Sequence, residues 1–108
     1  MTTLTRRADF LAANRGRRSP TPGFVLLVRD RQDGDATKRL GITVTRKIGG
    51  AVARNRMKRR LRALAREILP GLGVPGADHV LIGRAGGIER PFHELRAEFS
   101  QALAKLHP

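Results

Sequence analysis

The residues whose types and spacing indicate chemistry are seven cations in the segment ARNRMKRRLRALARE, residues 53–67. They are Arg54, Arg56, Lys58, Arg59, Arg60, Arg62 and Arg66. No acid interrupts the segment before Glu67. Guanidinium and ammonium groups bind phosphate oxygens through charge-assisted hydrogen bonds. The segment therefore predicts a surface that binds a polyanion.

The same segment predicts an amphipathic helix that ends at Pro70 and Gly71. Its apolar stripe at helical spacing consists of Met57, Leu61, Leu64 and Ile68. The opposite face carries Asn55, Arg59, Arg62 and Arg66. Like charges three or four residues apart cost about 0.2 to 0.5 kcal/mol per pair, whereas burying one large apolar side chain stabilises by roughly 1.5 to 3 kcal/mol. We therefore expect the helix to form and its cations to face outward.

The overall charge agrees with a polyanionic partner. The chain has 108 residues, a formal charge of +13, and eleven cations but no acid between Lys38 and Arg66. Such a concentrated patch favours nucleic acid over an anionic membrane surface or an acidic protein. A membrane-surface helix would also need an aromatic wedge on its apolar side, which is missing here. A solvated helix face and a calmodulin-type target helix stay open as alternatives.

Several function classes find no support in the residues. The absence of Cys excludes disulfides and thiolate chemistry and suits the cytoplasm. The longest apolar run, residues 24–28, is too short to span a bilayer. His79, His93 and His107 lack metal-site spacing, and the sequence GRAGG at 83–87 reads as a turn. We expect no catalytic residue, metal ligand or cofactor within the chain itself.

The remaining patterns predict a single α+β domain over residues 1–108. Helices are expected over residues 5–14, 53–69 and 91–106, and strands over residues 24–30, 39–47 and 79–85. In the first helix we expect Thr5 to cap the N-terminus and an apolar stripe of Ala8, Leu11 and Ala12, with Phe10 on the other side. The Asp33-Gly34 pair predicts that the first two strands form an antiparallel hairpin.

Residues 39–67, RLGITVTRKIGGAVARNRMKRRLRALARE, resemble the signature of the bacterial ribonuclease P protein subunit. The shared features are a glycine-bearing strand, a basic Lys-Ile-Gly turn and an Ala-Val-x-Arg-Asn-Arg helix. In that family the protein binds a large catalytic RNA, and the complex is an endonuclease that removes the 5′ leader from precursor tRNA. The resemblance implies one protein per RNA, catalysis by the RNA, and Mg²⁺ held by the RNA. It also implies a two-layer α/β sandwich with about four strands, three helices and a left-handed βαβ crossover.

Carried over by position, the resemblance implies two RNA-binding regions. The catalytic RNA would be contacted by Arg46, Lys47, Arg54, Asn55, Arg56, Lys58, Arg59, Arg62 and Arg66. The single-stranded leader would lie in a cleft between the first helix and the sheet, lined by Phe10, Leu27, Thr43, Thr45, Arg17 and Arg18. Phe10 is expected either to stack on an unpaired base or to pack on the sheet. Other aromatic residues common in the family are replaced here by Ala13 or Asn14 and by Leu27.

Two further classes of protein share these general features. A basic ribosome-associated RNA-binding protein would have the same size, charge and architecture. A DNA-binding module would need a recognition helix that enters the major groove.

Overall fold

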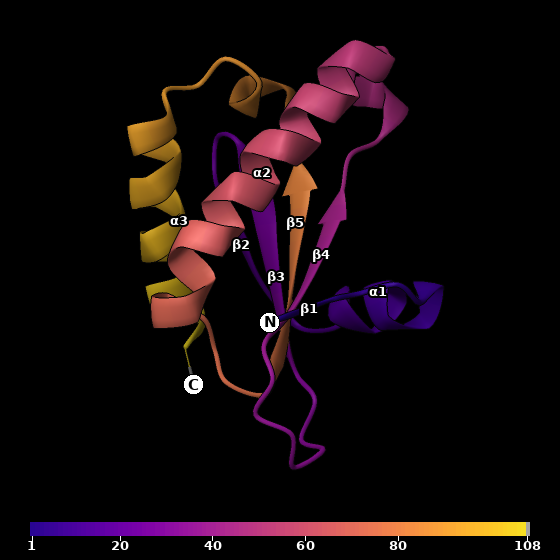
Figure 1. The fold of residues 1–108 in the computed structure, drawn as a ribbon, viewed down its shortest axis with the longest axis vertical. Coiled ribbons are helices and arrows are strands. Elements are labelled where there is room, and N and C mark those ends of the chain that lie inside the picture. The colour runs from indigo at the N-terminus through magenta and orange to yellow at the C-terminus, as the bar shows by residue number, and fades with distance from the viewer. Residues whose placement is uncertain (108) are drawn as a thin grey trace.

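The fold is known from a computed structural model, which describes residues 1–107. It consists of a mixed five-stranded sheet with the long helices α2 and α3 on one face and the short helix α1 on the other (Figure 1). The strands are β1 (Thr2–Thr3), β2 (Arg17–Pro20), β3 (Phe24–Asp30), β4 (Arg39–Thr43) and β5 (Ala77–Gly83), in the spatial order β1-β4-β5-β3-β2. The helices are α1 (Arg7–Ala13), α2 (Ala51–Leu72) and α3 (Phe92–Leu106). The α+β sandwich expected from the sequence is confirmed.

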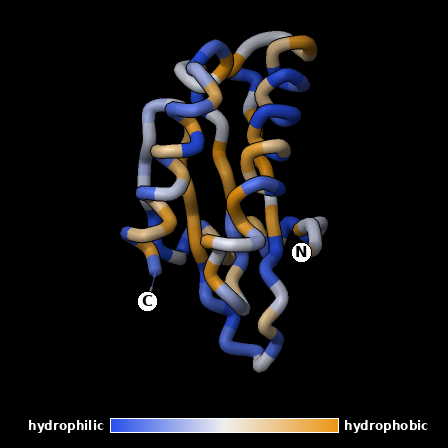
Figure 2. Tube along the Cα trace, turned by 60° about the vertical axis from the view of Figure 1, so that its left-hand side comes forward, coloured by the Kyte–Doolittle hydropathy of each residue, from blue (hydrophilic) through white to orange (hydrophobic). Residues whose placement is uncertain are grey.

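The main core lies between the sheet and the layer formed by α2 and α3. Met57, Leu61 and Leu64 are fully buried and Ile68 is 7% exposed, which confirms the predicted apolar stripe of α2. Figure 2 shows α2 changing repeatedly between hydrophilic and hydrophobic residues along its length, whereas the central strands are mostly hydrophobic. Phe99 of α3 and Phe24 of β3 complete this core in an edge-to-face contact, with ring centroids 5.6 Å apart.

The predicted end of α2 at Pro70 and Gly71 is wrong, because the helix continues through both residues to Leu72. Near the end of a helix a proline interrupts few further hydrogen bonds, and the last carbonyl oxygens need partners from outside the helix in any case. The Nζ of Lys38 donates to the carbonyls of Leu69 and Pro70, both at 2.9 Å. A cation at the C-terminus also complements the helix dipole.

The predicted stripe of α1 is also wrong. Leu11 is 52% exposed, whereas Ala13 is fully buried and Phe10 packs toward the sheet. Phe10 and Ala13 are three residues apart and share one helix face, so this pair is the true apolar side. The N-cap residue is Arg6, and no side chain caps the helix, so the expected capping by Thr5 is wrong as well.

The predicted hairpin does not form, because β5 lies between β3 and β4. β5 pairs antiparallel with β3 and parallel with β4. The residues just before β5 separate the two arms of the loop: Arg31 N donates to Gly76 O, and Gly76 N donates to Ala36 O. Gly34 does have the positive φ of a turn, 77°, but the strands on either side of it pair elsewhere. The antiparallel neighbour of β3 on its other side is β2.

The β4–α2–β5 connection has the left-handed crossover implied by the resemblance. In Figure 1 both strands point upward, α2 crosses in front of the sheet, and the chain moves from β4 to β5 on its left. Parallel β-strand crossovers are right-handed in almost all proteins. The fifth strand, β1, was not expected and forms the edge of the sheet next to β4. Two backbone hydrogen bonds hold it there, because Thr2 N donates to Lys38 O and Leu4 N donates to Leu40 O.

His79 is fully buried in β5 and holds two segments together. Its Nε2 accepts a hydrogen bond from Val74 N at 2.9 Å. Its Nδ1 lies 3.2 Å from Arg39 O and therefore carries the proton of the neutral ring. Burial lowers the pKa of His79 to about 4, although the Arg39 carbonyl favours the charged form.

This burial predicts a loss of stability in mild acid. The unfolded chain takes up a proton near pH 6.5 and the folded chain only near pH 4, so the stabilisation is complete above 6.5 and is lost as pH falls toward 4. We expect urea unfolding, followed by circular dichroism, to show a decrease of up to about 3 kcal/mol across this window. His79→Gln should flatten the dependence, whereas the exposed His93→Gln should retain it. Equal slopes in wild type and His79→Gln would refute this account.

Candidate nucleic-acid interface

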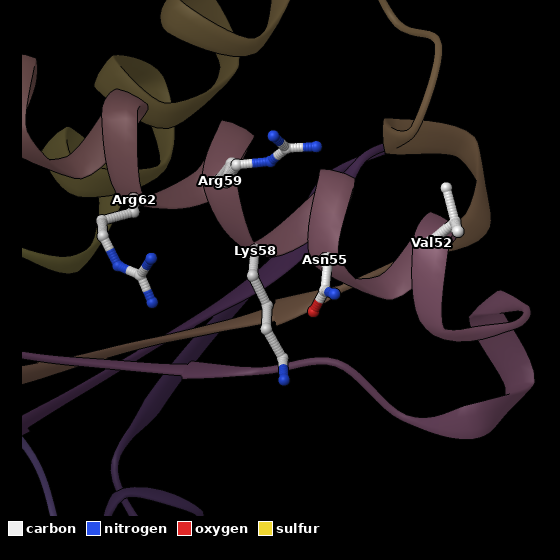
Figure 3. Close-up of a pocket in the computed structure, with 5 residues that line it drawn as sticks. All are labelled: Val52, Asn55, Lys58, Arg59 and Arg62. Atoms are coloured by element: carbon white, nitrogen blue, oxygen red, sulfur yellow. The ribbon is translucent and has the colours of Figure 1, made fainter.

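The cationic face of α2 is exposed as the sequence predicted. We call it the cationic ridge; its residues are Asn55, Arg59, Arg62 and Arg66. Among residues 1–107, no acidic side chain forms an ion pair with these three arginines. Figure 3 shows Asn55, Lys58 and Arg62 projecting to one side of α2. These residues, with Val52 and Arg59, line an open hollow of about 470 Å³.

The turn before α2 adds further cations beside the ridge. Arg46 and Lys47 are exposed in a short 3₁₀ helix, Arg46–Ile48. Gly49 follows with a φ of 145°, a conformation that side chains rarely adopt, and allows the chain to turn sharply into α2. Arg54 lies half-buried in the first turns of α2. The predicted RNA-binding residues therefore lie on this turn and along α2.

Two cations of the segment are engaged by α3 and by the loop before it. Arg56 forms a 3.2 Å ion pair with Glu89. Arg60 donates to the carbonyl of Arg90, and its guanidinium lies 6.0 Å from the ring centroid of Phe92. Arg60 therefore joins α2 to α3 and is not part of the ridge.

The sheet face under α1 consists of three rows of side chains. Along each strand, every second side chain points to the same face of the sheet. Residues paired directly across neighbouring strands also point to the same face. The charged row is Arg39, Asp78 and Arg29. The buried row is Gly41, Val80 and Leu27, and it extends to Arg18 on β2. The open row is Thr43, Ile82 and Val25, all half-buried.

A second hollow lies beside the open row, and we call it the leader cleft. It has a volume of about 460 Å³ and is lined by Thr5, Arg7, Phe10, Ile42, Thr43, Val44 and Lys58. Lys58 lines both this cleft and the hollow on the cationic ridge. The two predicted RNA-binding regions are therefore adjacent and meet at this side chain.

Phe10 packs on the sheet and borders the leader cleft at the same time. One side of its ring contacts Gly41 so closely that a Cβ there would lie 2.6 Å from Cε1. The ring also packs on the small cluster formed by Leu4, Ala13, Leu27 and Val80. The two alternatives stated for Phe10 are thus compatible, because the half-buried ring retains an exposed part.

The other residues assigned to the leader cleft occupy different environments. Leu27 is 1% exposed and supports the ring of Phe10 from below, so it presents no surface to a ligand. Arg18 lies on the α1 face of the sheet, whereas Arg17 is paired with Val28, a core residue of the opposite face, and binds Asp30 at 3.0 Å. Thr43 lines the cleft, and Thr45 is exposed just before the 3₁₀ turn.

Sequence reasoning did not assign Val25 or Ile82 to this region. The signal was present, because both alternate with core residues of their strands and so point to the face opposite α2. Only the strand order places them beside Thr43. Thr5, Ile42 and Val44 also line the cleft and were not assigned to it from the sequence.

Residues 1–107 contain no cluster of three or more His, Cys, Asp or Glu side chains placed to hold a metal ion. No helix in this part of the chain is long and apolar enough to cross a membrane.

Together these features define a small, strongly basic α+β domain in which a cationic helix borders an apolar cleft, a combination suited to binding single-stranded and structured nucleic acid. The profile of the family described as Ribonuclease P matches residues 1–107. The chain therefore belongs to the ribonuclease P protein family, which confirms the resemblance seen in residues 39–67.

Individual relatives agree over nearly the whole chain. The ribonuclease P protein component of Erythrobacter litoralis is 58% identical over 102 residues, which cover 94% of this chain and 83% of the relative. That of Ruegeria pomeroyi is 48% identical, covering 96% and 85%. The solved ribonuclease P protein of Thermotoga maritima superposes with a TM-score of 0.82 at 32% identity, covering 98% of each chain.

We predict that Arg59→Ala with Arg62→Ala weakens binding to structured RNA without unfolding the protein. Each lost phosphate contact should lower the slope of log K against log salt by about 0.7 to 0.9. Filter binding across a salt series measures this slope. A charge-matched control is Arg96→Ala with Lys105→Ala on α3, where Arg96 already pairs with Glu67. If both double variants change the slope equally, only net charge matters and the ridge is not the contact.

Proposed function

We propose that this chain is the protein subunit of a ribonuclease P ribonucleoprotein that removes the 5′ leader from precursor tRNA. The observation that carries the proposal is the meeting of the cationic ridge and the leader cleft at Lys58, in a chain of this family. A single protein can then hold the catalytic RNA with one surface and the leader with the adjoining one.

In this proposal the cationic ridge and the preceding turn bind the catalytic RNA. The guanidinium groups of Arg59, Arg62 and Arg66 are exposed and carry no acidic partner among the described residues. Binding a phosphate therefore breaks no ion pair. It also releases condensed counterions, which favours association at moderate salt.

The leader would lie along the open row, with Phe10 at one side. Half-buried Val25 and Ile82 offer an apolar floor, and Arg7 and Lys58 offer cations at the rim. A base stacked on a ring needs no particular hydrogen-bonding pattern, so this arrangement would accept leaders of many sequences. Arg18 at the end of the buried row would add a further phosphate contact.

The hydrolytic step is assigned to the RNA, with Mg²⁺ held by the RNA component and no catalytic residue in the protein. Two observations support this assignment. Asp78 is fully buried; burial alone would raise its pKa, but hydrogen bonds from Arg39 and Arg31 outweigh that effect and lower it. His79 is likewise buried with both ring nitrogens engaged. Neither group can exchange protons with a bound substrate. We also propose one protein per RNA and a cytoplasmic complex.

A cleavage assay tests the proposal directly. The cognate RNA and precursor tRNA are incubated at low Mg²⁺ with and without the protein, and release of the leader is followed on a gel. We expect the protein to accelerate cleavage. No acceleration, or selective recovery of ribosomal RNA in a pull-down with the tagged protein, would overturn the assignment.

Phe10→Ala should selectively weaken binding of the leader. Stacking of one base contributes roughly 1 to 3 kcal/mol, so the preference for precursor over mature tRNA should fall about 5- to 150-fold. Equilibrium binding of both tRNAs to the reconstituted holoenzyme measures the ratio. Leu11→Ala is the matched control, since this apolar residue of the same helix is exposed and lies outside the cleft. An equal loss for both tRNAs would make Phe10 a purely structural residue.

A further inference from the structure

The charged row of the sheet is a network of ion pairs across three strands. Asp78 in β5 is fully buried between Arg39 in β4 and Arg29 in β3. Arg39 binds both carboxylate oxygens of Asp78, with Nε 2.6 Å from Oδ1 and Nη2 2.8 Å from Oδ2. Arg31 adds a third hydrogen bond at 2.9 Å, and Arg29 lies 3.6 Å away.

Helix α1 contributes one acid to this network. Oδ1 of Asp9 lies 3.4 Å from Arg39 and 3.8 Å from Arg29, so the carboxylate bridges the outer strands of the row. Its side chain is only 20% exposed, which limits screening by solvent. Asp9 is the only acid that joins α1 to the sheet among the described ion pairs.

Apart from this bridge, α1 is held to the sheet by the apolar packing of Phe10 and Ala13. The helix has seven residues, lacks a side-chain cap, and fully buries only Ala13. An isolated helix of this length is unstable in water, so its position depends on contacts with the sheet. The bridge from Asp9 to Arg39 and Arg29 is the charged contact that joins the helix to the sheet among the described ion pairs.

We propose that Asp9 is a positioning residue for leader binding, which rests on the function proposed above. By holding α1 over the charged row, Asp9 places its neighbour Phe10 over Gly41 in the next row, with the exposed part of the ring directed to the open row and the cleft. If α1 shifts, the ring leaves the cleft although the sheet stays intact.

Gly41 provides the second half of this arrangement. A Cβ at this position would lie 2.6 Å from Cε1 and 2.9 Å from Cζ of Phe10, and 3.0 Å from Cδ1 of Leu4. Only glycine permits the ring to approach the strand this closely. Gly41→Ala should therefore displace the ring of Phe10 by a clash with the strand, whereas a change at Asp9 should displace it by releasing the helix.

The network below Asp9 is complete without it. In Asp9→Asn the buried Asp78 retains its contacts to Arg39 and Arg31, so no buried charge is left unpaired. The variant removes one charge with almost no change of shape. Asp9→Glu keeps the charge, and Asp30→Asn is a matched control because Asp30 pairs with Arg17 away from the cleft.

The experiment measures binding of precursor and leaderless tRNA to the reconstituted wild-type and variant holoenzymes. We expect Asp9→Asn and Gly41→Ala each to lower the precursor preference by about tenfold or more, with unchanged affinity for the catalytic RNA. Asp9→Glu should largely restore the preference, and Asp30→Asn should keep it. Hydrogen exchange should show faster exchange in α1 of Asp9→Asn but not in α2.

The outcomes separate the two proposals. A wild-type holoenzyme without any precursor preference would refute leader binding itself. A normal wild-type preference that Asp9→Asn retains in full would refute the positioning role alone. Exchange that increases equally in α1 and α2 would show that Asp9 contributes to global stability, and would also refute it.

Discussion

Burial of the apolar face of α2 against the sheet is the interaction on which both the fold and the proposed interface depend. The same 22-residue helix supplies Met57, Leu61 and Leu64 to the core and the cationic ridge to the surface. Repulsion among neighbouring cations costs a few tenths of a kcal/mol per pair, which is small beside the burial of three large side chains. The core therefore holds in place a charge density that a free helix would not maintain.

The two faces of the sheet serve different purposes. The face toward α2 and α3 carries the main core, whereas α1 covers only the charged and buried rows of the other face and leaves Thr43, Ile82 and Val25 partly open. A half-covered sheet is normally a liability, because exposed apolar strand surface favours association. Here the open strip is short and bordered by cations, which suits an extended polyanion better than another protein surface.

Whether a feature could be predicted from the sequence depends on how far apart along the chain the interacting residues lie. The α2 stripe was correct because helical periodicity is local and repeats over several turns. The hairpin between residues 24–30 and 39–47 was wrong because β5, more than thirty residues later, inserts between the two strands through contacts that no local pattern encodes. The prediction of the α1 stripe was wrong because a helix of seven residues has too few turns to define the spacing of its apolar residues. Phe10 and Thr43 were predicted to line the cleft, but placing Val25 and Ile82 in the open row beside it required the strand order.

The distribution of acids explains how a chain of net charge +13 directs its cations. Every acid except Asp35 lies within ion-pair distance of an arginine. Nearly all of these arginines lie on the strands, in the loop at residues 30–37, or on and just before α3, and Arg56 is the single partner on α2. The acids therefore stabilise cations that hold elements together and leave those of the ridge available. Because an exposed, already paired arginine must exchange one anion for another, it contributes less to RNA binding than an unpaired one. In the proposed function, specific affinity for RNA would therefore depend on which cations lack acidic partners, and not on the total charge.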